Sequence, residues 1–229
     1  MSIFSIKKIC FLGFFLVSAS QVAQSDFELL HEPTFLINHG FSENYRANFG
    51  LTARHFMYRD NEIFFKNRQV QVSHFSTFTL SYDQSLSMGI MFRESNLFDD
   101  QANNEIRLTQ QYNLTKRTFG IRFGHRIMNE QRLFRRNTTY RIRYRLALDS
   151  PLQGEKLDIG EAYIVVNTEF LLSLNKRSNP AMDNRITTQI GWQKSEVLKL
   201  QVGLQYRFDD LNQDIQHKLL LLTSAILKI

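Results

Sequence analysis

The chain has 229 residues, 43% of them hydrophobic and 13% aromatic, and a formal net charge of +6 at neutral pH. This length suits one domain with a sizeable interior. Cys10 is the sole cysteine, so it has no disulfide partner in the chain, and the six histidines lack the spacing of a zinc site. No phosphate-binding glycine loop or nucleotide motif occurs. We therefore expect no metal, no cofactor and no catalytic residue from a known motif.

Residues 1–25 have the features of a secretory signal peptide. Two lysines precede an apolar run that is too short to span a bilayer, and small residues follow the run. Cleavage after Ser20 and cleavage after Ser25 both fit this pattern, and we favour Ser25. The sequence thus predicts export, with 26–229 as a single domain.

The clearest pattern in that domain is 139–149, read TYRIRYRLALD. Arginines occupy positions 141, 143 and 145, and tyrosine, isoleucine or leucine occupies the neighbouring positions on either side. Successive side chains of a strand point to opposite faces, so the segment predicts a strand with one basic and one apolar face. Such a strand needs two different environments. Water outside with a dry core is one arrangement, and lipid outside with a wet interior is the other.

The same alternation recurs along the chain and predicts an all-β protein of about ten strands. The predicted strands are 45–57, 70–82, 86–93, 105–114, 118–127, 139–149, 161–174, 185–193, 198–209 and 217–229. The N-terminal segment 26–43 is expected to lie in the periplasm or enter the lumen of a barrel formed by 44–229. Pairing by 34–38 would instead raise the strand count to twelve.

Three features favour lipid outside over a soluble periplasmic β-barrel that binds a ligand. Most of the predicted strands are long enough to cross a bilayer at a tilt, which takes about 9–11 residues. Short connections alternate with long polar ones, and we expect the long loops 59–69, 95–104, 128–138 and 175–184 on the exterior. Glycines fall on the polar face, where they leave room for arginines. We therefore predict an antiparallel up-and-down transmembrane β-barrel in the bacterial outer membrane.

Several short motifs resemble one bacterial family, domain of unknown function 2490. They are YRIRYRLAL at 140–148, Glu161, Asn167, Glu169, Asn184-Arg185, Gly191 and GLQYRF at 203–208. The resemblance implies an uncharacterised outer-membrane β-barrel, and it brings no activity or catalytic residue with it. The chain departs from many such barrels because it ends in Ile229 rather than an aromatic residue.

The polar face carries many more basic than acidic side chains. The predicted lumen cluster is Arg107, Arg122, Arg141, Arg143, Arg145, Arg185 and Arg207, and its acidic partners are Glu105, Glu161 and Glu169. One interpretation is a structural network in which Glu161 and Glu169 bridge arginines of neighbouring strands. The other is a narrow porin-like pore or binding barrel that favours small anionic solutes, because unpaired buried cations are costly.

Two further features concern partners and enzymatic activity. The predicted exterior loop at 128–138 carries Arg132, Arg135 and Arg136, which suit the phosphates of lipopolysaccharide. His74 and Ser76 resemble the histidine-then-serine order of an outer-membrane lipid hydrolase, but no third group is evident to orient the histidine. We expect outer-membrane lipid and the barrel-assembly machinery as partners, and no nucleic acid.

Overall fold

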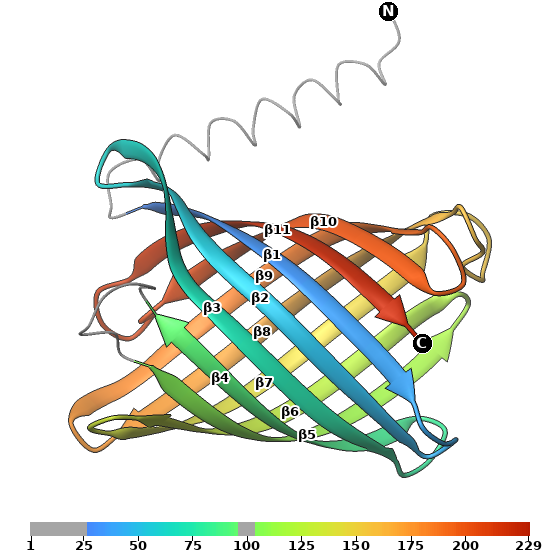
Figure 1. The fold of residues 1–229 in the computed structure, drawn as a ribbon, viewed down its shortest axis with the longest axis horizontal. Coiled ribbons are helices and arrows are strands. Elements are labelled where there is room, and N and C mark those ends of the chain that lie inside the picture. Colours follow the sequence, from blue (N-terminus) through green and yellow to red (C-terminus); the bar gives the residue numbers. More distant parts are fainter. Residues whose placement is uncertain (1–26, 96–103) are drawn as a thin grey trace, which may run out of the picture.

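A computed structural model describes residues 27–95 and 104–229, which form a closed β-barrel of eleven strands (Figure 1). This confirms the predicted all-β barrel, and the predicted signal peptide lies outside the described residues. No helix among the described residues is long and apolar enough to cross a membrane. The strands are β1 (Glu28–Gly40), β2 (Tyr45–Arg59), β3 (Glu62–Thr79), β4 (Gln84–Ser95), β5 (Glu105–Thr118), β6 (Ile121–Phe134), β7 (Thr138–Pro151), β8 (Ala162–Asn175), β9 (Ser178–Gln193), β10 (Leu198–Asp209) and β11 (Gln216–Lys228).

Each strand pairs antiparallel with the next, and β1 closes the barrel against β11 in parallel. The parallel pairing follows from the odd number of strands, because an up-and-down chain of eleven brings its first and last strands together pointing the same way. The seam is regular over its length, from Glu28 opposite Lys218 to Asn38 opposite Lys228. Closure removes free strand edges, which would otherwise pair with other chains.

Strand β1 lies in the barrel wall, so the expectation that 26–43 lies in the periplasm or the lumen is wrong. The alternative, that 34–38 pairs as a strand, is confirmed, but the strand count is eleven and not twelve. The sequence conceals this strand because both of its faces mix polar and apolar residues. Glu28 and Glu32 point inward with Leu30 between them, whereas the outward side carries His31 and Pro33. Proline within a run also argues against a central strand, since it cannot donate to the ladder.

The barrel has an N-terminal end, where β1 begins, and a C-terminal end, where β11 finishes. Three of the long loops predicted on the exterior are instead extensions of the strands, joined at the N-terminal end by turns of only two or three residues at 60–61, 135–137 and 176–177. Most of the fourth, 95–104, lies outside the described residues. Asp60 and Asn61 have φ values of 53° and 65°. A two-residue turn with two positive φ angles matches the twist of paired strands. The β2–β3 hairpin therefore continues beyond the rim (Figure 1).

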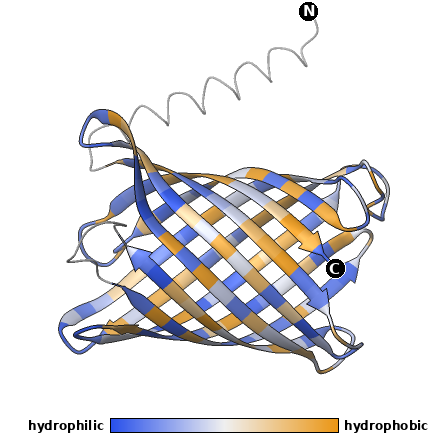
Figure 2. Ribbon diagram, in the orientation of Figure 1, coloured by the Kyte–Doolittle hydropathy of each residue, from blue (hydrophilic) through white to orange (hydrophobic). Residues whose placement is uncertain are grey.

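Polar and apolar residues alternate along most of the strands and give the wall a chequered appearance (Figure 2). The apolar side chains point outward: Phe49, Ile142 and Leu204 are 49%, 52% and 52% exposed. The acidic side chains on the opposite face are buried, with Glu105 at 1% and Glu130 at 2% exposure. The interior is therefore polar and the exterior apolar, as the predicted faces require.

A small apolar cluster inside the barrel supports the seam. Leu30 of β1 and Leu220 of β11 are fully buried and pack with Phe56, Leu222 and Phe64. Burying a leucine or phenylalanine side chain contributes about 1.5–3 kcal/mol. This cluster holds β1 and β11 against β2 next to the charged interior residues described below.

Candidate functional site in the barrel interior

The barrel interior divides into two halves of different chemistry. Toward the N-terminal end lies the charged half, and toward the C-terminal end lies the neutral half. On β5, for example, the inward positions change from Glu105 and Arg107 to Thr109, Gln111 and Asn113. The charged half comprises Glu28, Glu32, Arg54, Arg68, Arg93, Glu105, Arg107, Glu130, Arg132, Arg141, Arg143, Glu169, Asp183, Arg185, Arg207, Asp209 and Lys218. We call the other half neutral because uncharged polar side chains predominate there: Asn38, Asn48, Ser87, Gln111, Asn113, Tyr163, Gln189 and Gln201. It also holds a few charged groups, namely Arg122 paired with Asp149, Arg126 bound to Asn113 at 2.7 Å, and Lys199 over the Tyr163 ring.

Glu105 is the first centre of the charged half. It begins β5, and its two oxygens bind arginines from three strands. Arg93 of β4, Arg107 of β5 and Arg132 of β6 approach at 3.1, 2.8 and 2.7 Å. Arg132 binds both oxygens of the carboxylate, which is the strongest geometry for this pair. One carboxylate thus fastens three neighbouring strands together.

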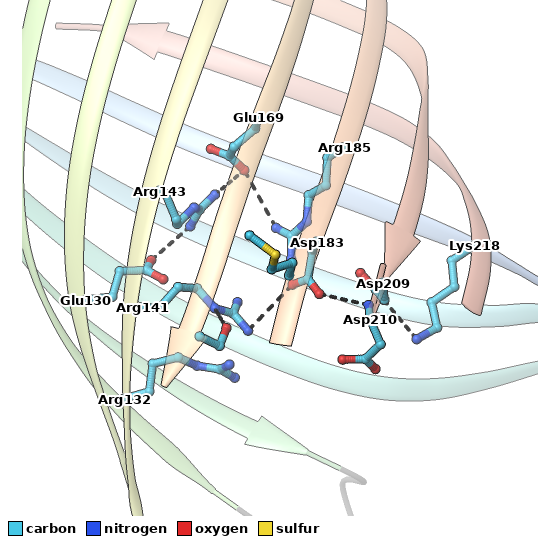
Figure 3. A network of polar contacts seen from close by, with 12 residues as sticks. Glu130, Arg132, Arg141, Arg143, Glu169, Asp183, Arg185, Asp209, Asp210 and Lys218 are labelled. Atoms are coloured by element: carbon cyan, nitrogen blue, oxygen red, sulfur yellow. Dashed lines mark hydrogen bonds and ion pairs between the residues drawn. The ribbon is translucent and has the colours of Figure 1, made fainter. Parts of the chain in front are cut away.

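Glu130 and Glu169 continue the network across the next strands (Figure 3). Glu130 of β6 accepts bonds from Arg107 at 3.0 Å and from Arg143 of β7 at 2.9 Å. The same Arg143 guanidinium donates to Glu169 of β8 at 2.6 Å. An unbroken series of ion pairs therefore runs from β4 to β8, with Arg143 joining its last two carboxylates.

A second group of ion pairs lies at the parallel seam. Glu32 of β1 binds Arg54 of β2, and Glu28 binds Arg68 of β3 at 3.0 Å. Lys218 of β11 binds Asp209 of β10 at 2.9 Å. Buried ion pairs gain little net stability over apolar packing, but removing one partner is costly. Each charged group therefore depends on its partner on a neighbouring strand, and these ion pairs brace the wall.

A cavity of about 300 Å³ lies within the charged half. Asp210 at its edge begins the β10–β11 connection, and partial burial together with the Asp183 and Asp209 carboxylates raises the pKa of its carboxyl group. Cations dominate the lining, which consists of Arg54, Arg68, Gln69, Arg93, Arg107, Arg132, Arg141, Ala181, Asp183, Arg185, Arg207, Asp209, Asp210 and Lys218. Nine cationic side chains and three carboxylates thus face one space.

Most of the predicted basic cluster comes together in the charged half. Its members there are Arg107, Arg141, Arg143, Arg185 and Arg207. Arg145 lies at the edge of the network and contacts Glu169 at 3.3 Å. Arg122 is separate: it is half exposed near the C-terminal end and pairs with Asp149 at 2.7 Å.

The acidic partners are only partly those predicted. Glu105 and Glu169 contact arginines, but Glu161 lies in the β7–β8 connection and accepts a bond from the backbone N–H of Asp158 at 2.9 Å. Its predicted bridge between strands is therefore wrong. Glu130 was missed because the predicted strand stopped at 127. Continuing the alternation through 128, 130 and 132 would have placed Glu130 inside.

The predicted lipopolysaccharide contact also changes. Arg132 lies on β6, faces inward and binds Glu105, so its placement in an exterior loop is wrong. Arg135 and Arg136 do lie in the connection between β6 and β7, and both are exposed. Their contact with lipopolysaccharide stays a prediction.

On the outer face, His74 Nε2 and Ser76 Oγ are 3.1 Å apart. The same Ser76 oxygen is 3.0 Å from the Tyr45 hydroxyl. His74 Nδ1 is buried and has no hydrogen-bond partner among the described residues. A serine nucleophile needs its histidine oriented by a third group on that nitrogen. The pair therefore has the histidine–serine contact of a hydrolase, but among the described residues no third group orients the histidine.

Comparison with known proteins identifies a family but no individual relative. No curated protein and no solved structure matches the chain. The model of one family, described as "Protein of unknown function (DUF2490)", matches residues 34–218, which run from within β1 into β11. That span covers most of the barrel wall and every strand of the Glu105–Glu130–Glu169 network. The chain belongs to the DUF2490 family of proteins of unknown function.

Proposed function

We propose that the protein is an outer-membrane β-barrel whose charged interior braces the wall and receives small anions. One observation carries the location: apolar side chains such as Ile90, Ile142 and Leu204, each about half exposed, point outward from a closed wall. In lipid, every backbone polar group needs a partner within the protein, and a closed barrel supplies one. Its strands have 12 to 18 residues, enough to cross a bilayer at a tilt.

The role of the interior rests on the excess of cations around the cavity. Ion pairs account for much of the charged half, which supports a structural role for Glu105, Glu130 and Glu169. Counted with the paired glutamates and with Asp210, the charged half still has ten cationic side chains against eight carboxylates, which favours anions over cations. A binding barrel uses both features, since the braced wall holds the cationic groups in place.

A narrow anion-favouring pore is the second candidate. It is supported by the neutral half, where hydrophilic side chains such as Gln111, Asn113 and Gln201 continue the polar lining toward the C-terminal end. Neutral polar groups let hydrated ions pass without holding them. The binding barrel and the pore differ in one measurable quantity, the ionic current through the protein.

Fractionation tests the location. We expect the protein in the outer-membrane fraction, resistant to alkaline extraction and with faster gel migration when it is not boiled. Recovery from the soluble periplasm would contradict the proposal and favour a soluble binding barrel.

Planar-bilayer recording of the refolded protein then separates the two roles. A binding barrel gives no steady current, whereas a pore gives a current that falls or loses anion selectivity when Arg141, Arg143 and Arg145 are replaced by glutamine. Ester hydrolysis that disappears in Ser76→Ala would instead establish the hydrolase alternative.

A further inference from the structure

Two buried arginines face each other across neighbouring strands in the charged half. Arg207 of β10 lies directly opposite Arg185 of β9 in the register of the sheet. Both side chains are largely buried, at 9% and 15% exposure, and both line the cavity. Like charges directly opposite each other destabilise a sheet unless something neutralises them.

A second pair of opposed arginines shows how the fold neutralises such a contact. Arg107 of β5 lies opposite Arg132 of β6. Glu105 binds both members of that pair, at 2.8 and 2.7 Å. A shared carboxylate therefore makes the Arg107–Arg132 contact tolerable.

The Arg185–Arg207 pair has no comparable carboxylate among the described residues. The closest acidic oxygen to Arg185 is Glu169 Oε2 at 3.8 Å, and Arg143 already binds this oxygen at 2.6 Å. For Arg207 it is Glu32 Oε2 at 3.9 Å.

That Glu32 oxygen already accepts two bonds from Arg54. In addition, Arg185 Nε is buried without a hydrogen-bond partner. Both guanidiniums therefore retain donor capacity that the neighbouring acids do not use.

Arg141 of β7 adds a third loosely paired guanidinium to the same cavity. Its carboxylate contact, to Asp183, is 4.0 Å long, and its Nε donates to Ser173 Oγ at 2.8 Å. Guanidinium groups bind phosphate and carboxylate oxygens through paired N–H donors. Three such groups around about 300 Å³ suit a small anion with at least two negative charges.

We propose that the cavity binds a phosphate group, held between Arg185 and Arg207 in the way that Glu105 is held between Arg107 and Arg132, with Arg141 as a third donor. This inference rests on the anion-receiving role proposed above and names the ligand chemistry and residues. Phosphate suits the site because it offers several oxygens to donors that converge from β7, β9 and β10. The group can belong to free phosphate or to a soluble or lipid-bound phosphomonoester.

Calorimetric titration of the detergent-solubilised full chain tests the proposal. Inorganic phosphate and glycerol 3-phosphate are the two probes, in chloride buffer of matched ionic strength. We expect saturable binding of at least one probe, and about a tenfold or greater loss of affinity in Arg185→Gln and Arg207→Gln. Preference for glycerol 3-phosphate would indicate a phosphomonoester, and equal binding would indicate that the phosphate group alone is recognised.

Two variants keep the result interpretable. Arg122→Gln removes a cation at the opposite end and is expected to bind like the wild type. Gln205→Glu places a carboxylate on a side chain that already accepts a bond from Arg207 at 2.5 Å. We expect it to raise the unfolding temperature without phosphate and to weaken phosphate binding at least about tenfold.

Three results would overturn the site: no saturable binding of either probe, equal affinity in Arg185→Gln and the wild type, or unchanged affinity in Gln205→Glu. Location is measured separately from binding. A periplasmic protein that binds phosphate through Arg185 would contradict the membrane proposal and leave this inference intact.

Discussion

The charged and neutral halves of the interior belong to one wall but are stabilised in different ways. In the charged half, carboxylates are shared: Glu105 binds three arginines, and Arg143 binds two glutamates. In the neutral half, contacts are mostly pairwise, such as Asn48 to Asn38 at 2.6 Å and Gln201 to the Tyr163 hydroxyl at 2.8 Å. Removing one shared group leaves several buried groups without a partner, whereas removing one member of a pair leaves only one.

The difference matters because of what remains after a partner is lost. A buried neutral group without its hydrogen bond costs about 1–3 kcal/mol, and an uncompensated buried charge costs more. Disrupting the charged half is therefore costly, so its geometry is firmly held, which suits a binding site. The neutral half tolerates change, which suits a lining that no ligand needs to recognise.

The largest expected effect is from Glu105→Gln. The substitution leaves Arg93, Arg107 and Arg132 facing an amide in the charged half, and breaking a buried ion pair costs about 3–5 kcal/mol. We expect a loss of that size in the free energy of unfolding, measured with urea in detergent or lipid vesicles. Glu161→Gln is the matched control, because Glu161 lies in a connection and binds no arginine. Similar losses in both variants would show that the network does not brace the wall.

A smaller effect is expected when an arginine is placed on the outer face. Leu204 is about half exposed and points outward, so Leu204→Arg should cost about 2–4 kcal/mol in a phospholipid bilayer. Gln201→Arg points into the neutral half, where polar neighbours receive the new charge, and we expect it to cost much less. Urea unfolding of vesicle-inserted protein measures both. Equal costs would contradict either lipid outside or a hydrated neutral half.

How far the sequence predicts this arrangement depends on the strand. On β7 and β10 the two faces differ sharply, so the arginines at 141 and 143 and at 207 could be placed inside from alternation alone. On β1 both faces are mixed, so Glu28 and Glu32, which bind cations at the seam, could not be found. Turn lengths were also mispredicted. The polar residues around Asp60 and Asn61 suggested a long loop, but these two residues alone form the turn.

The register between neighbouring strands was not predicted from the sequence. The opposition of Arg185 and Arg207, on which the phosphate site rests, depends on the register of β9 against β10. Alternation assigns each residue a face but not a height in the barrel. Alternation also does not fix where a strand begins. The spacing of Glu161 fits a strand, but β8 begins one residue later, at Ala162.

Glycines give a third comparison, within the neutral half. A Cβ added to Gly191 would lie 2.3–2.6 Å from the Tyr163 ring and its hydroxyl oxygen, whereas one added to Gly124 would meet nothing closer than 3.9 Å. Gly191→Ala should therefore displace the ring and its bond to Gln201, at a cost of about 1–3 kcal/mol for overpacking. Gly124→Ala should be nearly neutral in the same urea titration. Comparable costs would mean that the ring does not rest on Gly191.

The smallest effect is expected at the β6–β7 connection, where the exposed Arg135 and Arg136 are predicted to bind lipopolysaccharide phosphates at the exterior rim. Exposed ion pairs contribute only about 0.2–1 kcal/mol each. We expect lipopolysaccharide to raise the unfolding temperature of the wild type in detergent, and to raise that of Arg135→Ala/Arg136→Ala less. Arg132→Ala separates rim from interior: it loses two bonds to Glu105 and should be destabilised with or without lipopolysaccharide. An equal lipopolysaccharide-induced rise in the wild type and the double variant would refute the contact, and would leave the N-terminal end without evidence that it faces the exterior.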